Sequence, residues 1–224
     1  MRKTRTLSFT APLVLAAALG VAAGPAGRGG IHEDVPATVD PAARYVVYLH
    51  GRIMETKGRQ AVSPEFGLYD YDGVLRELAG KGLVVISEVR RGNAQMSYAK
   101  KVAAQVRRLE AGGVPARHIT VAGFSKGGLL ARATAAELGD PAVNFVLLAA
   151  CGRQESDPAQ AGKLKGRILS LYDESDEMAG SCQRLFAPGM ETKEVKLATG
   201  LRHGVFYRPR SDWVTMVAEW AAAK

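Results

Sequence analysis

The chain has 224 residues, of which 47% are hydrophobic and 23% are charged. This composition is typical of a folded globule and excludes a disordered or fibrous chain, while the length suits one domain better than two. The formal net charge is +8 at pH 7, but the basic residues lie throughout the chain. Because no basic helix interleaved with aromatic residues accompanies them, we expect no nucleic-acid partner.

Residues 1–24 have the pattern of a secretory signal peptide. Basic residues at positions 2, 3 and 5 precede an apolar stretch from Leu13 to Ala23, which gives way to Gly24 and Pro25. An N-terminal membrane anchor is the alternative, but this stretch is shorter than the roughly 20 residues that span a bilayer. No later segment is apolar for long enough to cross a membrane, so we expect no stable membrane anchor. The mature protein is predicted to be periplasmic or secreted.

The next segment, residues 25–43, is rich in Gly and Pro and is predicted to be a linker or an extended arm, with order beginning at Tyr45. One domain then spans residues 44–224. Cys151 and Cys182 are the only cysteines of the chain, and in an oxidising compartment we expect them to form a disulfide. Two separate buried thiols are the alternative.

Short apolar runs alternate with helical patterns along this domain. Runs rich in Val, Ile, Leu and Tyr predict buried parallel strands over residues 44–51, 82–89, 118–123, 143–150 and 167–173, and a further strand is expected over 191–198. Helical spacing over residues 94–113 is carried by Met96, Ala99, Val102, Ala103, Val106 and Leu109. Other helices are expected over 71–78, over 126–138 and from Ser211 to the C-terminus. This alternation predicts an α/β fold, a three-layer α/β/α sandwich with a mostly parallel central sheet.

One serine lies between two glycines in the segment VAGFSKGG, residues 121–128, where a predicted strand meets a predicted helix. Ser125 therefore occupies a sharp turn at the carboxyl end of a parallel strand, where ligands and catalytic groups gather in such sheets. Gly123 and Gly127 allow close backbone approach, and the helix start directs N–H groups at anything bound to the serine oxygen. A tight turn that merely needed small residues is the alternative.

The pattern G-x-S-x-G in this strand–turn–helix context resembles the nucleophile elbow of the α/β-hydrolase family. The resemblance covers nearly all of the chain from Tyr45 onward and implies a serine nucleophile served by a histidine and a buried carboxylate. Of the four histidines, only His203 lies where this family places its base, between the last predicted strand and the final helix. The resemblance points to Asp176 as the acid, with Asp173 as the alternative. The order serine, acid, histidine is the one expected of this fold.

The family's chemistry also needs two backbone donors for an oxyanion. The resemblance places one at the N–H of Lys126, directly after the nucleophile. The segment YLHGR, residues 48–52, resembles the His-Gly motif of lipases and esterases, which makes the N–H of Arg52 the second donor. His50 and Gly51 are expected to shape this loop without transferring protons. The side chains of Lys126 and Arg52 are expected only to reach solvent.

Loop lengths bear on the shape of the site. Only residues 152–166 separate two predicted strands where related enzymes insert a lid, so a minimal member with an open site is expected. The longer segment from Ile53 to Tyr71 lies beside the predicted oxyanion loop and is expected to form one wall of the pocket. Arg90 and Arg91 end a strand on the catalytic side, where they either attract an anionic substrate or are ordinary surface residues.

Together these patterns predict an exported serine hydrolase that cleaves a carboxylic ester or a related acyl bond of a small-molecule substrate. Ser125, His203 and Asp176 would act through an acyl-enzyme intermediate. A peptidase, amidase or thioesterase on the same machinery is one alternative, and a non-catalytic binding protein on a hydrolase scaffold is another. No metal or organic cofactor is expected, because the sequence has neither a zinc-ligand pattern nor a phosphate-binding loop. The sequence leaves the oligomeric state open.

Overall fold

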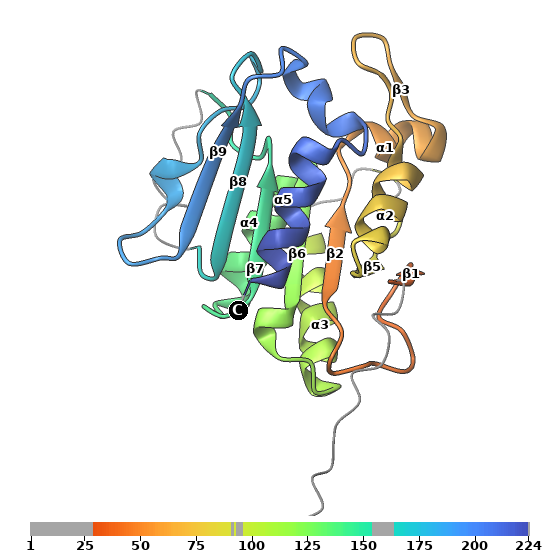
Figure 1. Ribbon diagram of the computed structural model, residues 1–224, viewed down its shortest axis with the longest axis vertical. Coiled ribbons are helices and arrows are strands. Elements are labelled where there is room, and N and C mark those ends of the chain that lie inside the picture. Colours follow the sequence, from red (N-terminus) through yellow and green to blue (C-terminus); the bar gives the residue numbers. More distant parts are fainter. Residues whose placement is uncertain (1–28, 91, 93–95, 154–163, 224) are drawn as a thin grey trace, which may run out of the picture.

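The computed structural model describes residues 29–90, 92, 96–153 and 164–223. Seven strands form one sheet in the order β1-β5-β2-β6-β7-β8-β9, and every pairing between neighbours is parallel (Figure 1). The strands are β1 (Ile31–His32), β2 (Tyr45–Leu49), β5 (Val84–Ile86), β6 (Ile119–Phe124), β7 (Asn144–Leu148), β8 (Arg167–Asp173) and β9 (Thr192–Leu197). A separate short hairpin consists of β3 (Val62–Ser63) and β4 (Gly67–Leu68).

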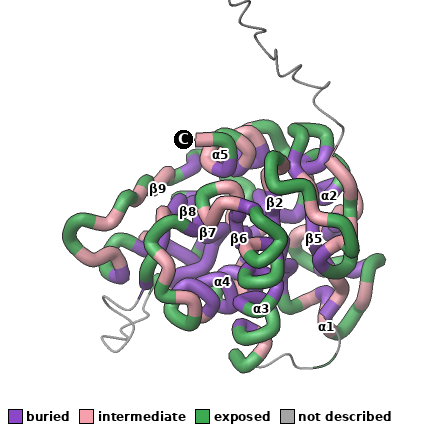
Figure 2. The backbone as a smooth tube through the Cα atoms, turned by 90° about the horizontal axis from the view of Figure 1, so that it is seen from below, coloured by how far each residue is buried: buried purple, intermediate pink, exposed green. Residues whose placement is uncertain are grey.

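Helices cover both faces of the sheet, which gives the predicted three-layer sandwich. Figure 2 shows the row of strands with α2 and α5 on one side and α3 and α4 on the other. The helices are α1 (Ile53–Lys57), α2 (Tyr71–Gly80), α3 (Tyr98–Ala111), α4 (Lys126–Leu138) and α5 (Ser211–Ala222). Short 3₁₀ helices are η1 (Gly58–Gln60), η2 (Ala116–His118), η4 (Gln183–Leu185) and η5 (Arg202–Tyr207).

The central strands β2, β6 and β7 are buried on both faces because each face packs against a different helix layer. In β2, Val46 and Tyr48 point into the core under α2 and α5, whereas Tyr45, Val47 and Leu49 point into the core under α3 and α4. All five side chains of β2 are buried. Alternation along a strand thus divides a continuous apolar run between two cores, as expected for a parallel sheet inside a sandwich.

Two boundaries differ from the sequence-based expectation. The helix predicted from residue 94 begins at Tyr98, and Met96 lies before it with 49% of its surface exposed, so Met96 is not part of the apolar face. Order begins earlier than Tyr45, because Ile31–His32 pairs with β5 and adds an edge strand to the sheet. The predicted extended arm thus takes part in the sheet through main-chain hydrogen bonds, which a Gly/Pro-rich composition does not signal.

The order of the strands fixes the place of a site. The chain runs from β2 outward to β5, then returns to the other side of β2 and continues outward from β6 to β9. The direction of winding therefore reverses between β2 and β6, whose carboxyl ends lie side by side through the pairing of Leu49 with Gly123. In open α/β sheets ligands bind in the crevice at such a switch point. His50, Arg52 and Ser125 follow directly after these two strand ends.

Cys151 and Cys182 form the predicted disulfide, with their Cα atoms 5.4 Å apart. The bridge connects the end of the β7 segment to the chain that follows β8. Within the described ranges, no helix is both long enough and apolar enough to cross a membrane. The predicted signal peptide, residues 1–24, lies outside the described residues.

Replacing both cysteines by alanine is expected to lower the free energy of unfolding by about 2–4 kcal/mol, because the bridge spans a sequence separation of 31 residues and restricts the unfolded chain. Urea unfolding followed by far-ultraviolet circular dichroism measures this difference. As a control, the wild type under a reducing agent should unfold at the midpoint of the double variant. Equal midpoints for the oxidised wild type and the double variant would contradict the expectation.

Candidate active site

Ser125 lies in the sharp turn between β6 and α4 in a strained backbone conformation. Its φ and ψ angles are 53° and −117°, a region that residues with a side chain rarely adopt and that costs of order 1–3 kcal/mol. The Ser125 N–H donates to the carbonyl of Leu148 at 2.9 Å, and the Ser125 carbonyl accepts from the N–H of Leu129 at 3.1 Å. The turn is therefore held from both sides, by the neighbouring strand and by the first turn of α4.

The glycines of this turn are required by close backbone contact. A Cβ atom on Gly127 would lie 1.9 Å from the carbonyl oxygen of Leu49, and one on Gly123 would lie 2.1 Å from the carbonyl oxygen of Gly127. These are backbone atoms that cannot move aside. The start of α4 consequently sits directly against the end of β2, which brings the segment after Leu49 next to Ser125.

His203 and Asp176 meet on the same edge of the sheet. His203 lies in η5, after β9, and Asp176 lies in the loop after β8. The Nδ1 atom of His203 is 2.7 Å from Oδ2 of Asp176, and both side chains are buried. The other oxygen of Asp176 accepts from the N–H groups of Met178 at 2.9 Å and Ala179 at 3.1 Å. Burial alone would raise the pKa of Asp176, but the hydrogen bonds from His203 and these N–H groups hold it below its ordinary value.

Asp173, the alternative acid, uses its carboxylate in the loop after β8 and in the turn after β9. One oxygen accepts from the N–H and hydroxyl of Ser175, and the other accepts from the N–H of Thr199 at 2.9 Å and its hydroxyl at 2.6 Å. Burial would raise the pKa of Asp173, but these donors outweigh it and hold the pKa below the ordinary value. Asp173 therefore joins the β8 end to the turn after β9, and Asp176 is the carboxylate in contact with His203.

The imidazole of His203 lies beside the serine turn. Its ring centroid is 4.9 Å from that of Phe124, the residue directly before Ser125. Among the described residues, no hydrogen bond joins the hydroxyl of Ser125 to the ring of His203. Catalytic hydrogen bonds are often long in the resting state and tighten only with substrate, so the arrangement is compatible with proton transfer between these groups.

The loop after β2 carries the second predicted oxyanion donor. A Cβ atom on Gly51 would lie 3.8 Å from the Cβ atom of Ser125, so this loop passes directly beside the serine. Arg52 is exposed and precedes the first residue of α1. Burial, followed by the positive charge of Arg90, lowers the pKa of His50 to about 3, so this ring is neutral at neutral pH.

Two sequence-based expectations about cations in this region are wrong. Arg90 is neither a surface residue nor a group available to a substrate, because its side chain is 1% exposed and contacts Glu55. The Lys126 side chain does not simply reach solvent, since its ammonium lies 2.6 Å from the Glu55 carboxylate. Arg91 lies outside the described residues. Glu55 itself was not predicted as a site residue, because its partners lie 35 and 71 residues away along the chain.

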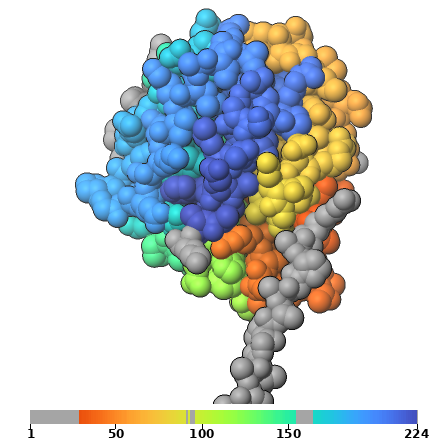
Figure 3. Space-filling view, in the orientation of Figure 1, coloured from red at the N-terminus to blue at the C-terminus, as the bar shows by residue number. Residues whose placement is uncertain are grey.

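Part of the segment between Ile53 and Tyr71, which was expected to form a wall beside the oxyanion loop, packs beside the histidine. Phe66, in the β3–β4 hairpin, has its ring 6.3 Å from that of His203. A hollow of about 400 Å³ is lined by residues of the hairpin and of η5, with Arg208 also among its lining residues. Figure 3 shows the orange hairpin segment against the blue η5–α5 segment at the top of the molecule. The predicted open, lidless region falls largely on residues 154–163, which lie outside the described residues.

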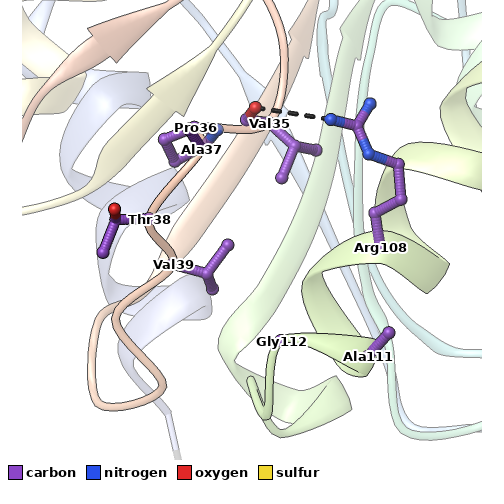
Figure 4. Close-up of a pocket in the computed structure, with 8 residues that line it drawn as sticks. All are labelled: Val35, Pro36, Ala37, Thr38, Val39, Arg108, Ala111 and Gly112. Carbon is purple, nitrogen blue, oxygen red and sulfur yellow. Dashed lines mark hydrogen bonds between the residues drawn. The ribbon is translucent and has the colours of Figure 1, made fainter.

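A larger hollow, of about 560 Å³, lies far from this edge, at the amino ends of the strands. It separates residues 35–39 of the N-terminal arm from the end of α3 (Figure 4). Its only ionisable lining residue, Arg108, is paired with Asp34 at 2.8 Å and reaches back to the carbonyl of Val35. No serine, cysteine, histidine or carboxylate side chain lines it, so its size does not make it the candidate active site.

No family model and no curated protein matches the sequence. Solved structures match the fold. SOBER1 from Arabidopsis thaliana has a TM-score of 0.58 at 13% identity, over 81% of this chain and 98% of that one. A structure described as an arylesterase has a TM-score of 0.55 at 14% identity, over 84% and 78%. A hyperthermophilic esterase from the archaeon Pyrobaculum calidifontis has a TM-score of 0.54 at 21% identity, over 80% and 75%.

These likenesses, together with the all-parallel order of the strands, show that the chain has the α/β-hydrolase fold. The predicted fold class is confirmed. The turn that contains Ser125 is a strand–turn–helix junction between β6 and α4, as the sequence predicted.

Asp173→Asn is expected to lower the free energy of unfolding at pH 7 by about 1–3 kcal/mol, because it weakens four hydrogen bonds to a charged acceptor. The folded-state pKa of Asp173 lies below its unfolded-state value of about 3.9, so the stabilisation is complete above that pH. It is lost as the pH falls through the folded-state pKa. Urea unfolding of both proteins from pH 7 to pH 3 should show a constant difference that shrinks below about pH 4. A difference independent of pH would contradict this role.

Proposed function

We propose that the protein is an exported serine hydrolase that cleaves a carboxylic ester or a related acyl bond of a small molecule. The observation that carries the proposal is the 2.7 Å contact of His203 with Asp176, beside a serine whose backbone is strained at the switch point of the sheet. Solved structures described as esterases share the fold, which supports the same class of chemistry. The apolar stretch of residues 13–23 and the disulfide support export.

In the proposed mechanism, the protonated Nδ1 of His203 donates a hydrogen bond to Asp176, which leaves Nε2 free to act as the base. Nε2 removes the proton of the Ser125 hydroxyl as its oxygen attacks the substrate carbonyl carbon. The N–H groups of Arg52 and Lys126 stabilise the oxyanion of the tetrahedral intermediate. His203 then protonates the leaving group. In the second half of the reaction, Nε2 of His203 removes a proton from water as the water oxygen attacks the acyl carbonyl carbon. His203 then returns the proton to the Ser125 oxygen, and the carboxylic acid is released.

Asp176 serves this mechanism through its charge and its fixed position. Its carboxylate is held by two backbone N–H groups besides His203, so it cannot rotate without losing hydrogen bonds. The lowered pKa keeps it ionised at neutral pH. A fixed, ionised acceptor selects the tautomer with hydrogen on Nδ1 and stabilises the imidazolium that forms during attack.

A fluorophosphonate probe is expected to label the folded wild type at one serine and to leave Ser125→Ala unlabelled, because only an activated hydroxyl attacks the phosphorus. Labelling is detected by mass spectrometry of the intact protein. Ser97→Ala is the matched control, because Ser97 is exposed and its side chain makes no capping bond to α3. It should label like the wild type. A folded wild type that takes up no probe would favour a non-catalytic binding protein.

Hydrolysis of p-nitrophenyl esters, compared with matched amides and thioesters, identifies the bond. We expect the esters to be cleaved fastest, and preference for an amide would favour a peptidase or amidase.

Asp176→Asn is expected to lower kcat by about 10³–10⁴-fold with little change in KM, since the amide side chain favours the wrong tautomer of His203. Steady-state hydrolysis of a p-nitrophenyl ester measures this. The matched control is Glu177→Gln, whose side chain is 80% exposed and which should retain activity within about twofold. If Asp173→Asn lost activity as severely while Asp176→Asn kept it, the assignment of the acid would be wrong.

A further inference from the structure

A buried carboxylate joins the two segments that carry the proposed oxyanion donors. Glu55 lies in α1, three residues after Arg52, and its side chain is 2% exposed. Its Oε2 atom is 2.6 Å from the ammonium of Lys126, the residue directly after Ser125. Its Oε1 atom is 3.4 Å from Nε of Arg90. One carboxylate thus connects the loop after β2, the start of α4 and the loop after β5.

Arg90 extends this connection to the backbone of the oxyanion loop. Its N–H donates to Nε2 of His50 at 2.8 Å, and its guanidinium donates to the His50 carbonyl. Because His50 is neutral and accepts at Nε2, its remaining ring proton lies on Nδ1, which contacts the carbonyl of Gly51 at 2.8 Å. The chain is therefore held on both sides of the predicted donor Arg52. Arg90 holds His50, which precedes Arg52, and two ion pairs hold Glu55, which follows it.

We propose that Glu55 is a positioning residue that holds the N–H groups of Arg52 and Lys126 in the geometry needed to bind an oxyanion. The proposal rests on the proposed function. Its basis is that Glu55 acts on both donor segments at once. Its carboxylate pairs with the side chain of Lys126 and with Arg90, whose guanidinium donates to the carbonyl of His50 in the loop that carries Arg52.

Burial makes this arrangement rigid. A carboxylate removed from water is tolerated only when cations and hydrogen bonds compensate its charge, so Glu55 cannot leave Lys126 and Arg90 without a large penalty. Oxyanion donors act only within about 2.7–3.1 Å of the developing charge, and a small displacement of either segment weakens them. Direct proton transfer by Glu55 does not fit, because both carboxylate oxygens contact cations and the side chain is nearly inaccessible.

Glu55→Gln tests the proposal, because glutamine keeps the size of the side chain and removes the charge that Lys126 and Arg90 share. We expect kcat for a p-nitrophenyl ester to fall by about 10- to 100-fold, with KM within about threefold of the wild type. An alkylboronic acid, which forms a tetrahedral adduct with the serine, should lose affinity by the same factor as kcat/KM. A role limited to stability would lower the unfolding midpoint and leave the boronate affinity of the folded protein unchanged.

Lys126→Met and Lys126→Arg provide a second route if Glu55→Gln does not fold. Both keep the backbone N–H of residue 126, but only arginine keeps an ion pair with Glu55. We expect the methionine variant to lose about three- to tenfold in kcat and in boronate affinity, and the arginine variant to regain most of both. The matched control is Arg108→Met, which removes a cation paired with the half-exposed Asp34 at the amino ends of the strands and should behave like the wild type.

The outcomes separate this proposal from the proposed function. If the wild type hydrolyses esters through Ser125 but folded Glu55→Gln keeps kcat and boronate affinity within twofold, the positioning role is wrong and the hydrolase assignment stands. Equal losses in Lys126→Met and Lys126→Arg would also contradict it. A folded wild type that neither hydrolyses esters nor binds the boronate would overturn both.

Discussion

The candidate site depends on the contact between the first turn of α4 and the carboxyl end of β2. The two backbones are in direct contact there, since a Cβ on Gly127 would lie 1.9 Å from the Leu49 carbonyl oxygen. That approach forces the chain to turn within one residue, and Ser125 takes the strained conformation that results. The strain is maintained because β6 lies inside a continuous parallel sheet and α4 packs on its face, so neither neighbour can relax.

Three buried or nearly buried carboxylates share the edge of the sheet around this turn, and their surroundings give them different roles. Asp176 faces His203, Asp173 accepts only from its own loop and the following turn, and Glu55 faces two cations. The disulfide adds a covalent restraint on the loop after β8, which carries Asp176. In this loop the N–H of Gly180 also donates to the carbonyl of Cys151 at 2.8 Å. Each group of the proposed chemistry is thus held by a second interaction that does not face the substrate.

Much of this could be predicted from the sequence, because the signals were local. Buried strands read as continuous apolar runs, and G-x-S-x-G at a strand–helix junction required a turn at Ser125. Pairings between distant segments carry no such signal. The edge strand at Ile31 depends on main-chain bonds, which no side-chain pattern encodes. Arg90 was expected to be exposed. Its burial depends on an ion pair with Glu55, which lies 35 residues earlier in the chain, and the sequence does not show this pairing. An ion pair is visible in a sequence only when its spacing follows a helix.

The hairpin that contains Phe66 covers one side of His203. Phe66 packs against His203 and Tyr207, and a Cβ on Gly204 would lie 2.9 Å from the Phe66 ring, so the hairpin sits tightly on η5. An ion pair of 2.6 Å between Arg202 and Glu65 fastens it from outside. His203 is consequently only 7% exposed. Exclusion of water from one side of the imidazole strengthens its interaction with Asp176, since charges attract more strongly in a medium of low dielectric constant.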